Sequence, residues 1–583
     1  MSIHEKLKIV RVKEDIVLPP APNLRDTIAK RDGTEIPLDL RMYQRQMVVH
    51  LLAMNRFIVG DDTGLGKTVE TIAALCMIWR KDPEAKAVVL TKKSSVPQWA
   101  DEFKRFTQGA NIILCVGDPK QRLALQKQWE ESTGPTVLIQ GYSSACNDFK
   151  TLQHWEDYIL ICDEATVFKN PSTRVHKICK FFSAKAQRCW GLTATLIKNN
   201  LMEGYGVYRV VVPDLFRVTP NTFMNNYCMV QMQNIGRNRK VPVIVGYRDA
   251  DIERFREEID PFYLGRPKHA VAKDLPVLVT RDVTVGLTKF QHEKYQEALS
   301  GLLEHGDGED REVSHLTALI YCQEIVNHPA LIEFPDYESE KLNALIDLVT
   351  NDGDLDGEKV IVFTRFRAMV DFAVPVLEKL KVKCARVTGD ENEQQRRAAM
   401  NAFQDPNNPV KVIFITMAGG DAINLQAAKA LVFYDTPWSA GDYLQILGRM
   451  IRIGSDHDRV YAIHLICRDT IDEKVQAVYQ RKRKLLEKVL GERIKGEKGE
   501  DVIYAAGSPT KDLFDAMVAD ARKTMPGKFI AKKTRKAPAK KTSPAKTKTS
   551  PAVARHNPLD IKIPAPRDTP LVKDELRTVD FEL

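Results

Sequence analysis

Residues 61–68, Asp-Asp-Thr-Gly-Leu-Gly-Lys-Thr, combine glycines, a lysine and a hydroxyl at a spacing suited to phosphate. They follow a short apolar run and precede a helical pattern, which is the context of a phosphate-binding loop. Glycines let backbone N–H groups close around phosphate oxygens, Lys67 supplies positive charge, and the Thr68 hydroxyl can reach Mg²⁺. The strict pattern has glycine where Asp61 stands, so the match has one departure. The residues expected to surround the phosphates are Asp62, Thr63, Gly64, Leu65, Gly66, Lys67 and Thr68.

Two adjacent carboxylates, Asp163 and Glu164, end an apolar run 96 residues after Lys67. An aspartate at a strand end can hold Mg²⁺ through its water shell, and the neighbouring glutamate can orient or deprotonate an attacking water. A solvated acidic turn gives the same sequence, but the position after a phosphate loop favours catalysis. We therefore expect Thr68 and Asp163 to hold the metal and Glu164 to act on the water.

Two arginines, Arg449 and Arg452, lie far along the chain and three residues apart, so on a helix they share one face. Guanidinium groups aimed at a phosphate that the first half holds would stabilise the charge of phosphoryl transfer, an effect of roughly 10³–10⁵ in rate. An exposed basic helix face is the simpler interpretation of the pair alone. Because the first half has no arginine in an obvious place for this role, we expect both to be catalytic.

Two series of short apolar runs, rich in Val and Ile, must position these residues. Runs that are apolar on both faces are typical of central strands in a parallel sheet covered by helices. The first series is 57–59, 87–90, 137–139 and 158–162, and the second is 359–363, 410–415, 430–434 and 460–466. The sequence therefore predicts an α/β protein with two parallel-sheet lobes.

The segment between the two series has charged, helix-like patterns such as 251–259 and 290–303, which predict a helical insertion and linker, or alternatively a separate domain. Residues 471–492 predict one long amphipathic helix that braces the second lobe. The expected domains are an N-terminal arm (1–39), a first lobe (40–212), the insertion and linker (213–338), a second lobe (339–495), a connecting segment (496–520) and a tail (521–583).

Taken in order, the motifs resemble those of helicase superfamily two (DEAD/DEAH-like), and specifically the Swi/Snf family of DNA-translocating ATPases. The matching segments run from residue 40 to about 475, and they are Leu40-Arg41-Met42-Tyr43-Gln44, D-D-T-G-L-G-K-T, Thr91-Lys92-Lys93 with Gln98-Trp99, D-E-A-T, Gly191-Leu192-Thr193-Ala194-Thr195, Asn327-His328-Pro329 with Phe363-Thr364-Arg365-Phe366, Ala418-Gly419-Gly420 with Asn424-Leu425, and Q-I-L-G-R-M-I-R-I-G. Eight motifs in one order make the resemblance specific.

The resemblance implies two RecA-like lobes that bind ATP and Mg²⁺ between them, with Gln44 on the adenine base. It also implies residues that contact nucleic acid or couple it to hydrolysis, namely Lys92, Lys93, Thr193, Thr195, Arg365, Gly419, Gly420, Asn424 and Gln445. Where the family usually has His, Gly, Pro, Gly and Asn-Pro, this chain has Thr166, Ala194, Leu196, Ala422 and Ser439-Ala440. These departures concern coupling to DNA rather than hydrolysis itself.

The net charge of +9 is concentrated in residues 522–555, which hold 12 basic residues and no acidic one. Outside them, 74 basic residues face 77 acidic ones, so the body is nearly neutral. Residues 531–552 contain alanine as their only apolar residue, too little to offset the entropy of ordering, so we predict disorder. Such cations raise DNA affinity by counterion release, and the alternatives are a solubilising tail or a nuclear-localisation run. The cations expected to contact DNA are Lys532, Lys533, Arg535, Lys536, Lys540 and Lys541.

Composition excludes several classes of protein. The first residues lack the apolar segment of a signal peptide, and no apolar run approaches the roughly 20 residues of a membrane span. Ten scattered cysteines without a C-x-x-C pair argue against a zinc ribbon or a disulfide framework and favour a reducing compartment. Since no chromatin-reading motif flanks the lobes, we expect a compact bacterial or phage enzyme in the cytoplasm near the nucleoid, or a nuclear enzyme if the source is eukaryotic.

The sequence thus predicts an ATP hydrolase that moves on double-stranded or branched DNA and does not bind membranes. Two alternatives stay open. One is a strand-separating or branch-migrating helicase acting on DNA or RNA, and the other is an architectural DNA-binding protein whose motor has decayed.

Overall fold

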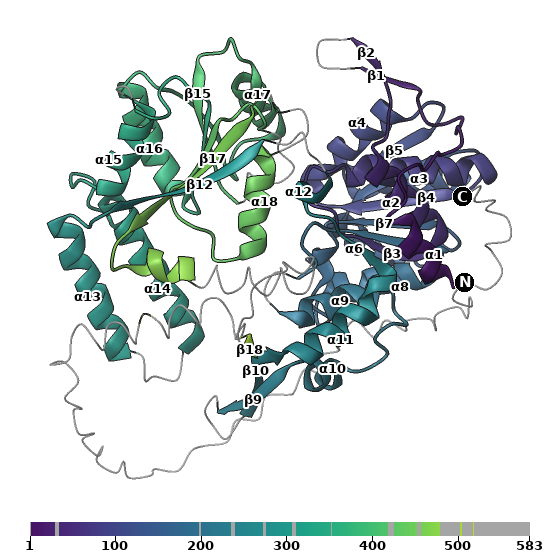
Figure 1. The fold of residues 1–583 in the computed structure, drawn as a ribbon, viewed down its shortest axis with the longest axis horizontal. Helices are drawn as coiled ribbons and strands as arrows, with labels where there is room; N and C mark the ends of the chain where they lie inside the picture. Colours follow the sequence, from purple (N-terminus) through teal and green to yellow (C-terminus); the bar gives the residue numbers. More distant parts are fainter. Residues whose placement is uncertain are drawn as a thin grey trace, which may run out of the picture.

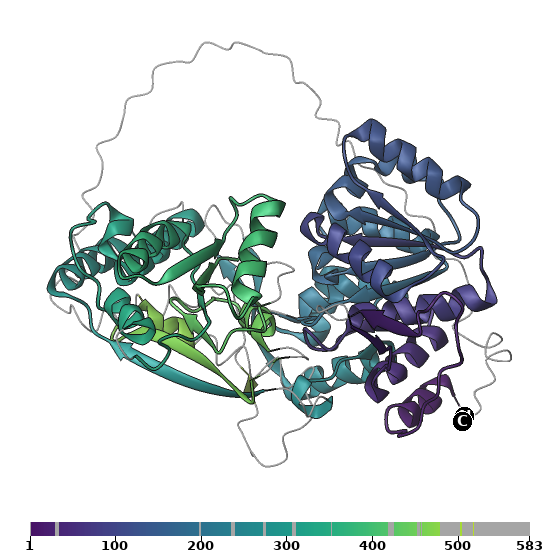
Figure 2. The same cartoon turned by 90° about the horizontal axis from the view of Figure 1, so that it is seen from above.

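The computed structural model describes residues 2–29, 34–197, 200–234, 240–271, 276–305, 311–350, 353–417, 425–451, 455, 457–477, 502–503 and 517. Within these ranges the chain forms two α/β lobes that lie side by side, as the two views in Figures 1 and 2 show. All ten cysteines are free. In the part of the chain that is described, every helix is too short or too polar to cross a lipid bilayer. The predicted basic tail, with the six cations expected to contact DNA, lies outside the described residues.

A seven-stranded parallel sheet forms the first lobe, in the order β11-β3-β8-β7-β4-β6-β5. Its strands are β3 (Arg56–Val59), β4 (Lys86–Thr91), β5 (Asn111–Cys115), β6 (Thr136–Gly141), β7 (Ile159–Asp163), β8 (Arg188–Leu192) and β11 (Tyr263–Leu264). Its helices are α2 (Met42–Ala53), α3 (Lys67–Lys81), α4 (Val96–Phe106), α5 (Pro119–Glu131), α6 (Tyr142–Asn147), α7 (Phe149–Leu152), α8 (Arg174–Lys185) and α9 (Leu201–Val211). Because β3 and β7 are parallel and separated only by β8, the residues that follow them meet at one edge of the sheet.

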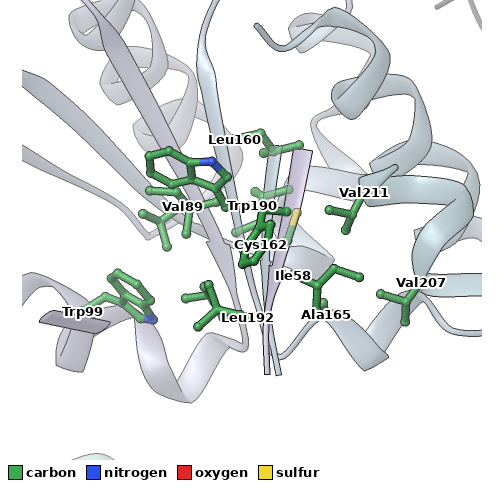
Figure 3. Close-up of a cluster of buried hydrophobic side chains, with 14 of the residues drawn as sticks. Ile58, Val89, Trp99, Leu160, Cys162, Ala165, Trp190, Leu192, Val207 and Val211 are labelled. Atoms are coloured by element: carbon green, nitrogen blue, oxygen red, sulfur yellow. The ribbon is translucent and has the colours of Figure 1, made fainter. Parts of the chain in front are cut away.

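The core of this lobe packs helices against both sides of the strands (Figure 3). Val207 and Val211 of α9 lie on one side, and Trp99 of α4 lies on the other. The strand side chains between them, including Ile58 and Trp190, are fully buried. Burial on both faces explains why these strands are apolar throughout instead of alternating with polar residues.

Six parallel strands form the second lobe, in the order β12-β17-β16-β13-β15-β14. They are β12 (Val277–Val285), β13 (Val360–Phe363), β14 (Lys383–Val387), β15 (Val410–Ile415), β16 (Ala430–Phe433) and β17 (Arg459–Cys467). The helices of this lobe include α15 (Glu340–Val349), α16 (Arg367–Lys379), α17 (Glu393–Gln404) and α18 (Ala440–Met450), and α18 lies on the side toward the first lobe (Figure 1). The predicted helix over 471–492 is helical from 471 to 477, and residues 478–492 lie outside the described residues.

All eight predicted strands are present, and their ends differ from the prediction by at most two residues. In the two parallel sheets as described, the pattern missed β5, β8, β11, β12 and β14. The β5 sequence, NIILC, has a detectable apolar run. In contrast, β8 carries Arg188 and Gly191, and β14 is an edge strand with Lys383 and Arg386, so neither presents an apolar run.

The expected helical insertion, residues 213–338, is only partly helical. Its helices include α10 (Pro220–Tyr227), α11 (Asp249–Ile259), α12 (Lys268–Val271), α13 (Lys289–His305) and α14 (Arg311–Asn327). It also contains the antiparallel hairpin of β9 (Met229–Asn234) and β10 (Lys240–Arg248), to which β18 (Val502–Ile503) adds a third strand. Two further strands, β11 and β12, join the sheets of the first and second lobes. Because β12 is a largely exposed edge strand, polar residues from Thr280 to Asp282 and at Thr284 interrupt its valines, and its place in the sheet follows from its pairing with β17.

The N-terminal arm packs on the first lobe beside β11. Its helix α1 (Ile3–Val10) begins with a capping box at Ser2, and it is followed by the short hairpin of β1 (Thr27–Ala29) and β2 (Glu35–Pro37). The Arg11 guanidinium donates to the Asp260 carboxylate at 2.9 Å and to the Tyr263 carbonyl at 3.0 Å. The arm thereby holds the segment that leads into β11.

Candidate active site

The phosphate loop connects β3 to α3, as its motif predicts. Gly64 and Gly66 have φ values of 90° and 100°, a left-handed conformation that glycine adopts without steric cost. Gly66 is also the N-cap of α3, and a side chain there would overlap the Gln44 amide. The Lys67 ammonium donates to the backbone carbonyls of Asp61 at 2.7 Å and Asp62 at 3.3 Å. The lysine therefore lies within the loop, at the N-terminus of a helix, where a phosphate is expected to bind.

The carboxylate pair follows β7 at the same edge of the sheet. One oxygen of Asp163, Oδ2, accepts hydrogen bonds from the Thr91 hydroxyl at 2.7 Å and from the Trp99 indole N–H at 2.8 Å. Burial raises the pKa of Asp163, the adjacent Glu164 carboxylate raises it further, and the two hydrogen bonds oppose this effect. Glu164 has a φ of 50°, an uncommon conformation for a residue other than glycine, and such strain is frequent at functional sites.

A cavity of about 330 Å³ lies between the loop, the carboxylate pair and α18 of the second lobe. From the first lobe it is lined by, among others, Thr63, Gly64, Gly66, Lys67, Thr68, Lys92, Asp163 and Glu164, and from the second lobe by Gln426, Gln445 and Arg449. The volume falls in the range of small-molecule sites. Three motifs that lie 96 and 286 residues apart in the sequence thus meet around one cavity.

The second lobe contributes through α18, which carries both Gln445 and Arg449. Arg449 is only 6% exposed and lines the cavity. One residue earlier, Gly448 packs directly on the phosphate loop, because a Cβ added to it would lie 2.7 Å from the Thr63 Cβ. Arg452 and the predicted residues Gly419, Gly420 and Asn424 lie outside the described residues.

Gln44, the expected adenine contact, is engaged with the loop. Its side-chain N–H donates to the Leu65 carbonyl at 2.9 Å, and its side-chain oxygen accepts from the Arg41 N–H at 2.9 Å. Tyr43 donates its hydroxyl to the same Leu65 carbonyl at 2.8 Å. Both side chains therefore fix the loop from α2, a role that the sequence did not indicate.

The predicted nucleic-acid contacts differ in their exposure. Lys93 is exposed, and Lys92 is partly buried at the cavity. Thr193 is buried, and its hydroxyl accepts from the Thr195 N–H at 3.2 Å. Arg365 stacks on the Trp438 ring at 3.9 Å and donates to the Gln323 side chain at 2.8 Å. Arg365 thus packs within the second lobe in this conformation.

Sequence reasoning missed Arg266, which lies directly after β11. Its guanidinium Nε donates to the Asp61 carboxylate at 2.9 Å, and its N–H groups also reach the Tyr43 carbonyl at 2.5 Å and the Gln46 side chain at 3.2 Å. The only signal in the sequence is Asp61 itself, an aspartate where the loop pattern has glycine. A buried carboxylate requires a partner, but the sequence does not say which cation supplies it.

A second carboxylate, Glu70, lies behind the loop on α3 and is fully buried. Its oxygen is 3.7 Å from the Arg266 guanidinium. Burial raises the pKa of Glu70, and the Asp61 charge raises it further, while Arg266 and Lys67 oppose the effect.

Groups of three or more His, Cys, Asp or Glu arranged to hold a metal do not occur among the described residues. Thr68 and Asp163 are the oxygen donors expected to hold a metal ion, and both line the same cavity.

Comparison with known proteins identifies the chain's relatives. A model of the SNF2-related domain matches residues 43–331, and a model of the helicase conserved C-terminal domain matches residues 340–454. The chain is 30% identical over 456 residues to a mouse chromodomain-helicase-DNA-binding protein 1-like, covering 75% of the chain and 48% of that protein. It is 26% identical over 466 residues to an uncharacterized ATP-dependent helicase of Mycoplasma genitalium, covering 78% and 43%.

Among solved structures, the Sulfolobus solfataricus SWI2/SNF2 ATPase core in complex with dsDNA is 24% identical, with a TM-score of 0.38 and coverage of 82% of this chain and 95% of that one. The chain spans about half the length of the curated relatives it matches. The SNF2-related match precedes the helicase C-terminal match along a chain that forms two parallel-sheet lobes. The chain belongs to the Snf2 family of helicase superfamily two.

Proposed function

We propose that the chain is a motor that couples ATP hydrolysis to movement along double-stranded DNA. The observation that carries this proposal is the cavity where Lys67, the pair Asp163 and Glu164, and Arg449 meet, because these groups come from both lobes. The names of its relatives, an ATP-dependent helicase and a helicase-DNA-binding protein, support the same function.

In the proposed reaction the loop N–H groups and Lys67 bind the β- and γ-phosphates of ATP. The Lys67 ammonium exchanges its two backbone carbonyls for phosphate oxygens. Glu164 orients the attacking water and accepts its proton, while Arg449 stabilises the charge on the transferred phosphoryl group.

Mg²⁺ would neutralise phosphate charge in this site. Thr68 and Asp163 would hold it, since both line the cavity and offer the oxygen donors that Mg²⁺ prefers. The hydrogen bonds of Thr91 and Trp99 to one oxygen of Asp163 orient that carboxylate. The residues present therefore fit the ion.

Coupling to movement follows from the position of Arg449. Because this arginine belongs to the second lobe, hydrolysis requires the two lobes to be in contact, and product release frees them. We infer that this cycle moves the chain along the duplex. Lys92 and Gln445, which line the cavity, and Lys93, Thr193 and Thr195, on their motifs, are proposed to transmit it. On the basis of their motifs alone, we propose the same coupling role for Arg365, Arg452, Gly419, Gly420 and Asn424.

We propose that the basic strip of residues 522–555 raises the affinity for DNA, without sequence preference, through counterion release. A motor of this kind acts where DNA is, which is the cytoplasm of a bacterium or the nucleus of a eukaryote.

The decisive experiment compares ATP hydrolysis with duplex DNA, branched DNA, single strands and RNA, together with displacement of a triplex-forming strand from a duplex. We expect duplex DNA to stimulate hydrolysis most and the third strand to be displaced only with hydrolysable ATP. Separation of duplex strands would instead establish a helicase. Absence of phosphate release on every substrate would overturn the proposal in favour of an architectural protein.

A further inference from the structure

The segment that contains β11 continues alongside the phosphate loop. The Leu264 carbonyl accepts from the Gly60 N–H at 2.7 Å, and the Arg266 carbonyl accepts from the Asp62 N–H at 3.1 Å. The Tyr263 ring lies so close to Gly60 and Gly265 that a side chain on either glycine would overlap it. The backbone of the loop is therefore hydrogen-bonded, over its first residues, to a segment that lies about 200 positions later in the sequence.

The Arg266 side chain reaches past this backbone pairing to the two buried carboxylates. Its Nε and its own backbone N–H both donate to Asp61 Oδ1, at 2.9 and 3.0 Å, and its second terminal N–H group reaches Asp61 Oδ2. Asp61 and Glu70 are fully buried, and the Arg266 side chain is only 11% exposed. A planar guanidinium is the side chain best suited to such forked contacts.

Asp61 connects this arginine to the lysine of the loop. The Asp61 carboxylate binds Arg266, while the Asp61 carbonyl accepts from the Lys67 ammonium at 2.7 Å. Arg266 also holds the carbonyl of Tyr43, whose hydroxyl binds the loop at Leu65. The guanidinium thus contacts Asp61, which belongs to the loop, and Tyr43, which binds the loop at Leu65.

We propose that Arg266 is a positioning residue for nucleotide binding, which holds the phosphate loop in its binding shape through Asp61 and Tyr43. The inference rests on the proposed function, because it assumes that this loop binds ATP. Asp61, which departs from the glycine of the general loop pattern, is then the partner that makes the loop depend on the segment after β11.

The test measures the Kd of a fluorescent ATP analogue and the separate KM and kcat of DNA-stimulated ATP hydrolysis. Arg266→Ala leaves Asp61 buried without its partner, so we expect the Kd and KM to rise about tenfold or more, with kcat at saturating ATP nearly unchanged. Asp61→Asn removes the buried charge. It also removes the other half of the same contact, so the double variant Asp61→Asn with Arg266→Ala should bind ATP no more weakly than Arg266→Ala alone.

The matched control is Arg248→Ala, which removes an arginine from the same part of the chain. Its side chain is 69% exposed and pairs with Asp251, so its Kd should equal that of the wild type. If Arg266→Ala is insoluble, Arg266→Lys decides the question, because it keeps the charge but loses the fork and should weaken ATP binding.

Wild-type affinity in Arg266→Ala, or in Arg266→Lys where that variant decides, would overturn the inference. A double variant whose loss of affinity equals the sum of the two single losses would overturn it as well. Failure of the wild type itself to bind the analogue would instead overturn the proposed function.

Discussion

Replacing Gly448 by alanine tests whether the contact between the lobes is the one that supports hydrolysis. In the structure the added Cβ would lie 2.7 Å from the Thr63 Cβ and 3.0 Å from its Cγ2. Ordinary contacts between such carbons begin at about 3.5 Å, so the overlap is close to 1 Å. Either α18 or the loop must move by about that distance, and Arg449 is the next residue on α18.

The expected effect falls on turnover rather than on ATP binding. A misplacement of about 1 Å at a catalytic group costs on the order of 10²-fold in rate, or about 2.7 kcal/mol in activation free energy. ATP affinity should change little, since the phosphate loop belongs to the first lobe. The second lobe should not unfold, because alanine in a helix is about 1 kcal/mol more favourable than glycine.

The assay is DNA-stimulated phosphate release at saturating ATP, with thermal melting to confirm folding. Gly286→Ala is the matched control, because a Cβ at that glycine of the same lobe meets nothing within 4 Å. Its kcat should equal that of the wild type. If Gly448→Ala hydrolyses ATP at the wild-type rate, the packing of α18 on Thr63 is not the hydrolytic arrangement, and the reasoning from this contact is refuted.

The remaining predictions concern single groups and the tail. Lys67→Ala should abolish ATP binding, since the ammonium at the centre of the loop is lost, and equilibrium binding of a labelled ATP measures this. Glu164→Gln should retain bound ATP without turnover, so a filter-binding assay should detect a stable complex, and normal turnover would remove its assigned role. Trp99→Phe removes a hydrogen bond that lowers the pKa of Asp163, so the pH below which hydrolysis fails should move upward, as a pH–rate profile would show. Deleting residues 526–583 should leave maximal hydrolysis nearly unchanged but weaken DNA binding. It should also flatten the plot of log affinity against log salt. Ten of the 12 cations of residues 522–555 are deleted, so the slope changes by at most about 9 if all ten bind phosphates, and an unchanged slope would exclude a tether.

Much of the fold could be predicted because the strands of a buried parallel sheet are locally apolar. The eight predicted strands are correct to within two residues, and the positions of the loop after β3 and of Asp163 after β7 follow from them. Strands without a continuous apolar run, such as β8, β12 and β14, could not be found in this way. β12 is largely exposed and is identified only by its pairing with β17, so residues expected in a linker extend the second sheet.

The local sequence predicts the chemistry of the site: a phosphate loop with Lys67 and Thr68, a carboxylate pair at a strand end, and Arg449 on a helix. Such motifs are local, because their residue types and short spacings are what the chemistry requires. The residues that surround these motifs became evident from the folded chain. It gave Asp61 the partner Arg266, Asp163 the partner Trp99, and Gly448 the neighbour Thr63. A buried charge or a close packing contact requires a partner that is near in space, and residues that lie 64 to 385 positions apart in the sequence, as these pairs do, carry no local pattern that indicates their proximity.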